Sequence, residues 1–156
     1  EILNLGRSHT GGDLHVYLPK ERVLFMSETY LHWLFPAMRS AYPSEWVQTV
    51  KNAESMDATW YVPGHGFVDD AKSLKADLPA YRRAMEQVIA EATRLHDAKV
   101  PCAAAAGGRG ASTTREPCEA AQKGNWGDLK NWTLFSSQLE TAIRKIYDEL
   151  DGKLSP

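Results

Sequence analysis

The sequence predicts an α/β fold in which a small mixed sheet is flanked by helices. Strand patterns fill residues 1–26, and a further short apolar segment stands at 58–62. Two long segments, 69–99 and 133–150, carry apolar residues at helical spacing. The 156 residues are 43% hydrophobic and 24% charged, which suits a single globular domain.

The first strands form a predicted hairpin. Residues 1–5 predict a short strand, and DLHVYLP alternates, with three apolar side chains on one face: Leu14, Val16 and Leu18. A polar turn then leads into RVLFM, which is apolar on both faces. We therefore expect the returning strand to be covered on both sides.

A helix and its preceding loop follow the hairpin. Residues 27–43 are rich in aromatic side chains and are interrupted by prolines, so they predict a loop with short helical turns. Residues 44–56 predict a helix with Ser44 as its N-cap. In the next helix, at 69–99, Pro79 predicts a boundary or a kink.

Residues 101–130 are rich in Ala, Gly, Ser and Thr and predict a flexible loop inside the single domain, 1–156. Cys102 and Cys118 flank part of this loop. A disulfide between them would stabilise the fold by roughly 3 kcal/mol and indicate a periplasmic or secreted protein. Two free thiols would indicate a cytoplasmic one, and the residues leave both alternatives open.

Charge and hydropathy exclude two kinds of partner. The formal net charge of -2 provides no basic field, so we expect no nucleic-acid binding. No apolar run approaches the roughly 20 residues that cross a membrane. We therefore expect neither a nucleic acid nor a membrane as a partner.

Three residues at strand ends could bind a metal ion. His9 lies in SHTGGD, Glu28 closes the strand RVLFM, and His65 lies in PGHG directly after the strand ATWYV. Imidazole and carboxylate groups are ligands for zinc, so the set predicts a zinc site. The alternatives are that His9 caps a turn, that Glu28 pairs with Arg39 or caps the next segment, and that His65 bonds within its own turn.

HTGGDLHVYLPKERVLF followed by YVPGHG resembles the later half of the metallo-β-lactamase superfamily of metallohydrolases. The tail from LKNWTLF onward resembles the cyclase-like or relay-type members. The resemblance implies the C-terminal half of an αββα sandwich. It also implies that the site holds one or two zinc ions, that His9 and His65 are metal ligands, and that Glu28 is the catalytic carboxylate and the bridging or second-metal ligand.

The chain departs from the family pattern in two places. The family usually has Gly-Asp at the bridging position, where this chain has Ser27-Glu28. The His-x-His-x-Asp-His motif of the family is absent, because His15, His32 and His96 form no such cluster. Only half of the metal site is therefore present in these 156 residues.

The resemblance implies hydrolysis of an ester, thioester or amide bond, lactams included, once an N-terminal half completes the site. Tyr30, His32 and Trp33 would then line the substrate pocket, and the alternative for these three is core packing. A different prediction is a half-domain without hydrolase activity. Such a chain would expose one apolar sheet face and form a homodimer through it.

Overall fold

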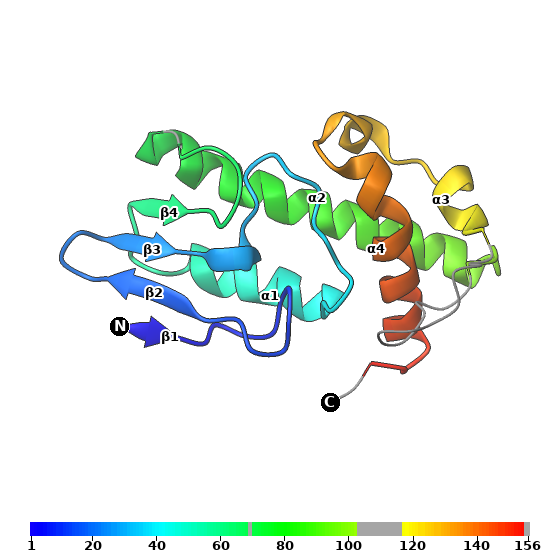
Figure 1. Cartoon of the computed structure of the whole chain (residues 1–156), viewed down its shortest axis with the longest axis horizontal. Helices are drawn as coiled ribbons and strands as arrows, with labels where there is room; N and C mark the ends of the chain where they lie inside the picture. The colour runs from blue at the N-terminus through cyan, green and yellow to red at the C-terminus, as the bar shows by residue number, and fades with distance from the viewer. Residues whose placement is uncertain (69, 103–116, 155–156) are drawn as a thin grey trace.

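The computed structural model describes residues 1–68, 70–102 and 117–154. In this part of the chain a small sheet lies at one end and the helices extend from it to the other end (Figure 1). The strands are β1 (Ile2–Leu3), β2 (His15–Leu18), β3 (Val23–Phe25) and β4 (Trp60–Val62). The helices are α1 (Pro43–Glu54), α2 (Ala71–Asp97), α3 (Glu119–Lys123) and α4 (Phe135–Leu150), with 3-10 helices η1 (Ser27–Thr29) and η2 (Gly127–Asn131).

The sheet has the order β1-β2-β3-β4 and is mixed, which confirms the predicted α/β class. β1, β2 and β3 pair antiparallel, and β4 pairs parallel with β3. The hairpin of β2 and β3 is as predicted. Its register places Val16 opposite Phe25, and Phe25 in turn lies opposite Val62.

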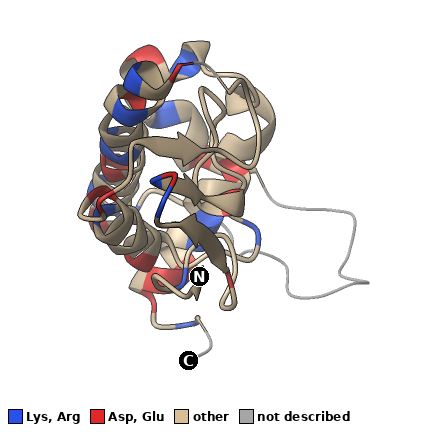
Figure 2. Cartoon of the chain, turned by 90° about the vertical axis from the view of Figure 1, so that its left-hand side faces the viewer, with Lys and Arg blue, Asp and Glu red and all other residues tan. Residues whose placement is uncertain are grey.

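One face of the sheet is covered by helices. Leu24 and Tyr61, neighbours on β3 and β4, are buried, and α2 packs against β4, α1 and α4. In Figure 2 the helices that carry many of the charged residues lie to the left of the strands. These helices close the core with an apolar stripe and present charge to solvent.

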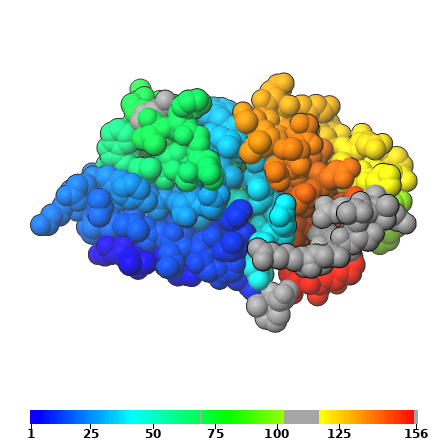
Figure 3. Space-filling model, in the orientation of Figure 1, coloured from blue at the N-terminus to red at the C-terminus, as the bar shows by residue number. Residues whose placement is uncertain are grey.

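The other face of the sheet is open in the described structure. Its side chains include Ile2, Val16 and Phe25, which are 73%, 42% and 41% exposed. In Figure 3 the blue N-terminal segment forms the surface on this side. The expected cover on both sides is thus present on one side only. The side chains of β2 alternate between the two faces as predicted. His15 lies on the buried face, whereas the apolar residues Val16 and Leu18 lie on the exposed face.

Two helix boundaries differ from the predictions. α1 begins at Pro43 after Tyr42, and Ser44 is not its N-cap. The Ser44 hydroxyl instead donates to Glu149 of α4 at 2.6 Å, so a tertiary contact takes the group that would cap the helix. α2 continues through Pro79, so this residue is not a helix boundary. Its buried stripe extends on both sides of that residue, and such packing outweighs a local preference.

The structure describes only part of the predicted loop at 101–130. Residues 103–116 lie outside the described residues, whereas 117–130 includes α3 and most of η2. Cys102 and Cys118 are joined by a disulfide, and Cys118 is fully buried. The disulfide ties the region after α2 to the start of α3. In the part of the chain described, none of the helices is both long and apolar enough to cross a membrane.

Candidate functional site

Glu28 stands just beyond the carboxyl end of β3. The Met26 amide donates to the Val62 carbonyl at 2.8 Å, which continues the pairing of β3 with β4 past the end of the strand. Ser27 then adopts a left-handed conformation with φ of 49°. Glycine reaches that conformation without strain, whereas the serine that stands here does so at some cost. The turn leaves the Glu28 side chain 35% exposed.

The Pro-Gly-His-Gly loop lies directly against this turn. The Gly64 amide donates to the Tyr30 carbonyl at 3.0 Å, and Leu31 forms a parallel bridge with His65. A Cβ atom on Gly64 would collide with the Ser27 carbonyl oxygen, and one on Gly66 would collide with that of His32. Both glycines are therefore required by the close approach of the two backbones.

The two segments bring the His65 ring into contact with the Glu28 carboxylate. His65 Nε2 lies 2.8 Å from Glu28 Oε1, and the side chains are 59% and 35% exposed. Two of the three predicted ligands thus meet at neighbouring strand ends, as the strand order β3-β4 requires. Both side chains are partly exposed to solvent.

A buried hydrogen-bond chain holds the SHTGGD loop against η1. The Ser8 hydroxyl donates to Asp13 at 2.6 Å and lies 2.8 Å from the Thr29 hydroxyl, which is 2.9 Å from His15 Nε2. The Ser8 hydroxyl hydrogen is used in the bond to Asp13. Ser8 therefore accepts from the Thr29 hydroxyl, and Thr29 accepts from His15 Nε2. Burial lowers the pKa of His15, which favours its neutral form.

His9 follows Ser8 but does not reach the other two predicted ligands. Its ring packs edge-on against Trp46 with 5.8 Å between centroids, and Trp46 Nε1 donates to the Thr29 carbonyl at 2.8 Å. His9 therefore lies near η1. Within residues 1–68, 70–102 and 117–154, no three His, Cys, Asp or Glu side chains are arranged to hold a metal ion.

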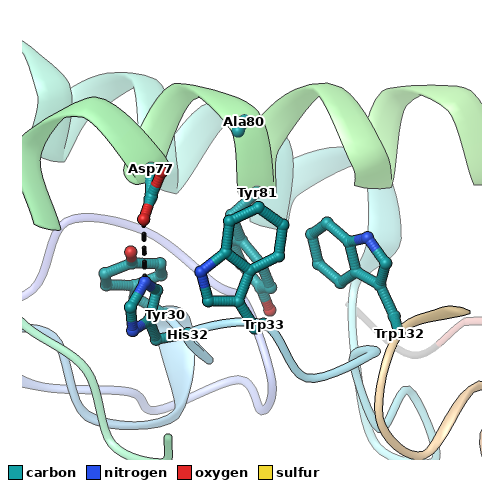
Figure 4. Close-up of a pocket in the computed structure, with 7 residues that line it drawn as sticks. All are labelled: Tyr30, His32, Trp33, Asp77, Ala80, Tyr81 and Trp132. Carbon is teal, nitrogen blue, oxygen red and sulfur yellow. Dashed lines mark hydrogen bonds and ion pairs between the residues drawn. The ribbon is translucent and has the colours of Figure 1, made fainter. Parts of the chain in front are cut away.

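The three predicted pocket residues line a small cavity (Figure 4). Tyr30 and His32 are buried and Trp33 is 49% exposed. With three residues of α2 and with Trp132 they surround a volume of about 10 Å³, room for about one water molecule. This placement agrees with core packing for Tyr30 and His32.

A larger hollow lies on the open face of the sheet. Its volume is about 310 Å³, which falls in the range of small-molecule sites. The lining is mostly apolar and consists of Leu14, Val16, Phe25, Ser27, Val62, Pro63 and Gly64. Ser27 and Gly64 precede Glu28 and His65, so the hollow adjoins the pair of predicted ligands.

Four supporting residues were not predicted from the sequence. Asp13, His15 and Thr29 hold the loop of His9, and Asp77 bonds His32. Only Asp13 gave a local signal, since Asp after a Gly-Gly turn is suited to bond the turn's own backbone. It does so by accepting from the Thr10 amide at 2.8 Å.

Comparison of the sequence with protein-family models and with curated proteins gives no match. The family resemblance therefore rests on the quoted motifs alone.

Replacing Gly64 by Ala tests the close approach of the two segments. We expect Gly64→Ala to lower the free energy of unfolding by about 1–3 kcal/mol, because the new methyl group overlaps the Ser27 carbonyl. Gly12→Ala is the control, since a Cβ there meets nothing within 4 Å. Urea unfolding measures both variants, and equal stability of the two would contradict the packing described.

Proposed function

We propose that this chain is the C-terminal half of a zinc-dependent hydrolase that cleaves ester, thioester or amide bonds, lactams included. The observation that carries the proposal is the 2.8 Å contact between His65 Nε2 and Glu28 Oε1 at adjoining strand ends. A ligand pair of this kind at strand ends is what the family resemblance implies. His9, which packs against Trp46 and does not join this pair in the described structure, is the third ligand that the resemblance implies.

The donor set fits zinc. Imidazole nitrogen and carboxylate oxygen are both common zinc ligands, and these two atoms lie 2.8 Å apart. Both side chains are partly exposed, so a metal ion can reach them without opening the core. The remaining ligands, including the His-x-His-x-Asp-His motif, would come from outside these 156 residues.

When bound, zinc would supply an activated water near neutral pH and polarise the scissile carbonyl group. The residues of this chain would bind the zinc ion. Glu28 would contribute the catalytic carboxylate and His65 an imidazole nitrogen. The apolar hollow next to them suits the non-reacting part of a small-molecule substrate.

The open sheet face supports the finer fold prediction. Ile2, Val16, Phe25 and Val62 form one continuous row across the four strands. A second sheet stacked on this row would complete an αββα sandwich and shield the apolar side chains from water. The N-terminal half implied by the resemblance is the proposed cover.

The disulfide supports an oxidising compartment as the place of action. Disulfides persist in the periplasm and in secreted proteins and are rare in the cytosol. We therefore propose a periplasmic or secreted location, with Cys102 and Cys118 paired as in the structure.

Zinc titration tests the ligand assignment. We expect the chain to bind Zn²⁺ in calorimetry and His65→Ala or Glu28→Ala to weaken the affinity at least about tenfold, because each removes a ligand. His96→Ala is the control, since His96 pairs with Asp151 away from the site. In the complete gene product the same two site variants should lose hydrolysis of chromogenic thioesters or lactams. Unchanged zinc affinity in both would contradict the assignment.

The second candidate is a half-domain without hydrolase activity that forms a homodimer through the open sheet face. Its support is the exposed apolar row, which a second copy could cover as well as an N-terminal half could. In this case Glu28 and His65 form only a surface ion pair.

Sedimentation velocity tests the homodimer. For this candidate we expect a dimer at micromolar concentration and a monomer for Phe25→Lys, since a buried ammonium group would lack a partner. Leu150→Lys is the control, because Leu150 on α4 is 42% exposed and Phe25 is 41% exposed. A monomeric wild-type chain would eliminate the homodimer.

A further inference from the structure

We propose that His32 and Asp77 form a positioning pair that holds His65 against Glu28. The inference rests on the proposed function, because it concerns the residues that support one of the proposed ligands. It gives His32 a role different from the pocket residue expected from the sequence.

His32 contacts the loop of His65 on both sides of Gly66. Its amide donates to the His65 carbonyl at 3.0 Å, and its ring Nδ1 donates to the Phe67 carbonyl at 2.9 Å. Between these bonds the His32 carbonyl lies so close to Gly66 that a side chain there is excluded. One residue therefore fixes the backbone at His65 itself and again two residues after it.

The orientation of the His32 ring is set by Asp77. His32 Nε2 lies 2.9 Å from Asp77 Oδ2, as the dashed line in Figure 4 marks. The Phe67 carbonyl can only accept, so the His32 Nδ1 donates to it, while Nε2 faces the Asp77 carboxyl group. Two hydrogen bonds, one at each ring nitrogen, therefore fix the orientation of the ring.

The surroundings prevent the ring from turning. His32 is 1% exposed and lies between the rings of Tyr30 and Trp33, with centroids 5.9 and 6.0 Å away. Asp77 belongs to α2, which packs on α1 and β4. A rigid helix thus fixes Asp77, Asp77 fixes the ring of His32, and the ring fixes the Phe67 carbonyl.

The loop itself has little other support. His65 has a side chain that is 59% exposed, and Phe67 and Val68 are 75% and 60% exposed. Apolar burial therefore contributes little to the position of this loop. The hydrogen bonds from the segment 30–32 therefore hold the loop in position, and the two from His32 hold it at the proposed ligand His65 and at Phe67.

Two substitutions at Asp77 separate positioning from stability alone. Asp77→Ala removes the acceptor, whereas Asp77→Asn keeps an oxygen acceptor without the charge. Glu54→Gln is the matched control, because it removes an ion pair with Arg82 that joins α1 to α2 and does not touch the loop. All proteins are compared below their unfolding transitions, where a purely structural loss leaves the folded site unchanged.

Nuclear magnetic resonance of the metal-free chain gives the deciding readout. We expect the nuclear Overhauser effect between the His65 ring and the Glu28 side chain to vanish in Asp77→Ala and to weaken in Asp77→Asn. The ring ¹⁵N shifts of His65 should move toward those of a free histidine. Glu54→Gln should match the wild type in both measurements. If Asp77→Ala does not fold, Asp77→Asn decides alone.

Zinc affinity is the second readout. Loss of a supporting residue around a metal ligand typically weakens binding 10- to 100-fold, so we expect a loss in this range for Asp77→Ala and a smaller one for Asp77→Asn. Unchanged His65 spectra in the folded Asp77 variants would overturn the positioning role. Failure of the wild-type chain to bind zinc would overturn the proposed function instead, and the metal-free spectra would still decide this inference.

Discussion

The close backbone approach between residues 27–32 and 63–67 is the contact on which the candidate site depends. It continues the parallel pairing of β3 and β4 beyond the strand ends, through the Gly64 amide and the Leu31–His65 bridge. Glycine at position 64 permits this approach, because any larger residue would strike the Ser27 carbonyl. His65 and Glu28 meet as a result of this backbone arrangement, and their own attraction is secondary because both side chains are partly exposed.

Two separate polar networks converge on the same short segment. The chain from Asp13 through Ser8 to Thr29 ties the loop of His9 to η1 from one side. From the other side, Asp77 and His32 fix the loop that carries His65. Both networks are largely buried, where a satisfied hydrogen bond is strong and an unsatisfied group is costly. The exposed donors are therefore supported by groups that have little freedom to move.

The sequence predicted what is local. Strand ends, the hairpin and the Pro-Gly-His-Gly turn follow from short-range patterns, and they were enough to expect Glu28 and His65 at neighbouring positions. Contacts set by tertiary packing were not predictable in this way. Alternation divides β2 into two faces, but only the position of α1 and α2 decides that the His15 face is the buried one. Asp77 carries no local signal, because its partner His32 is 45 residues away.

The central claim is that Glu28 and His65 are zinc ligands held ready by the backbone around them. X-ray absorption at the zinc edge of the loaded chain tests this claim most directly. We predict nitrogen and oxygen neighbours at about 2.0–2.2 Å with outer-shell scattering from imidazole, and a reduced imidazole contribution in His65→Ala. A zinc spectrum without imidazole scattering, or one that is identical in wild type and His65→Ala, would contradict the account.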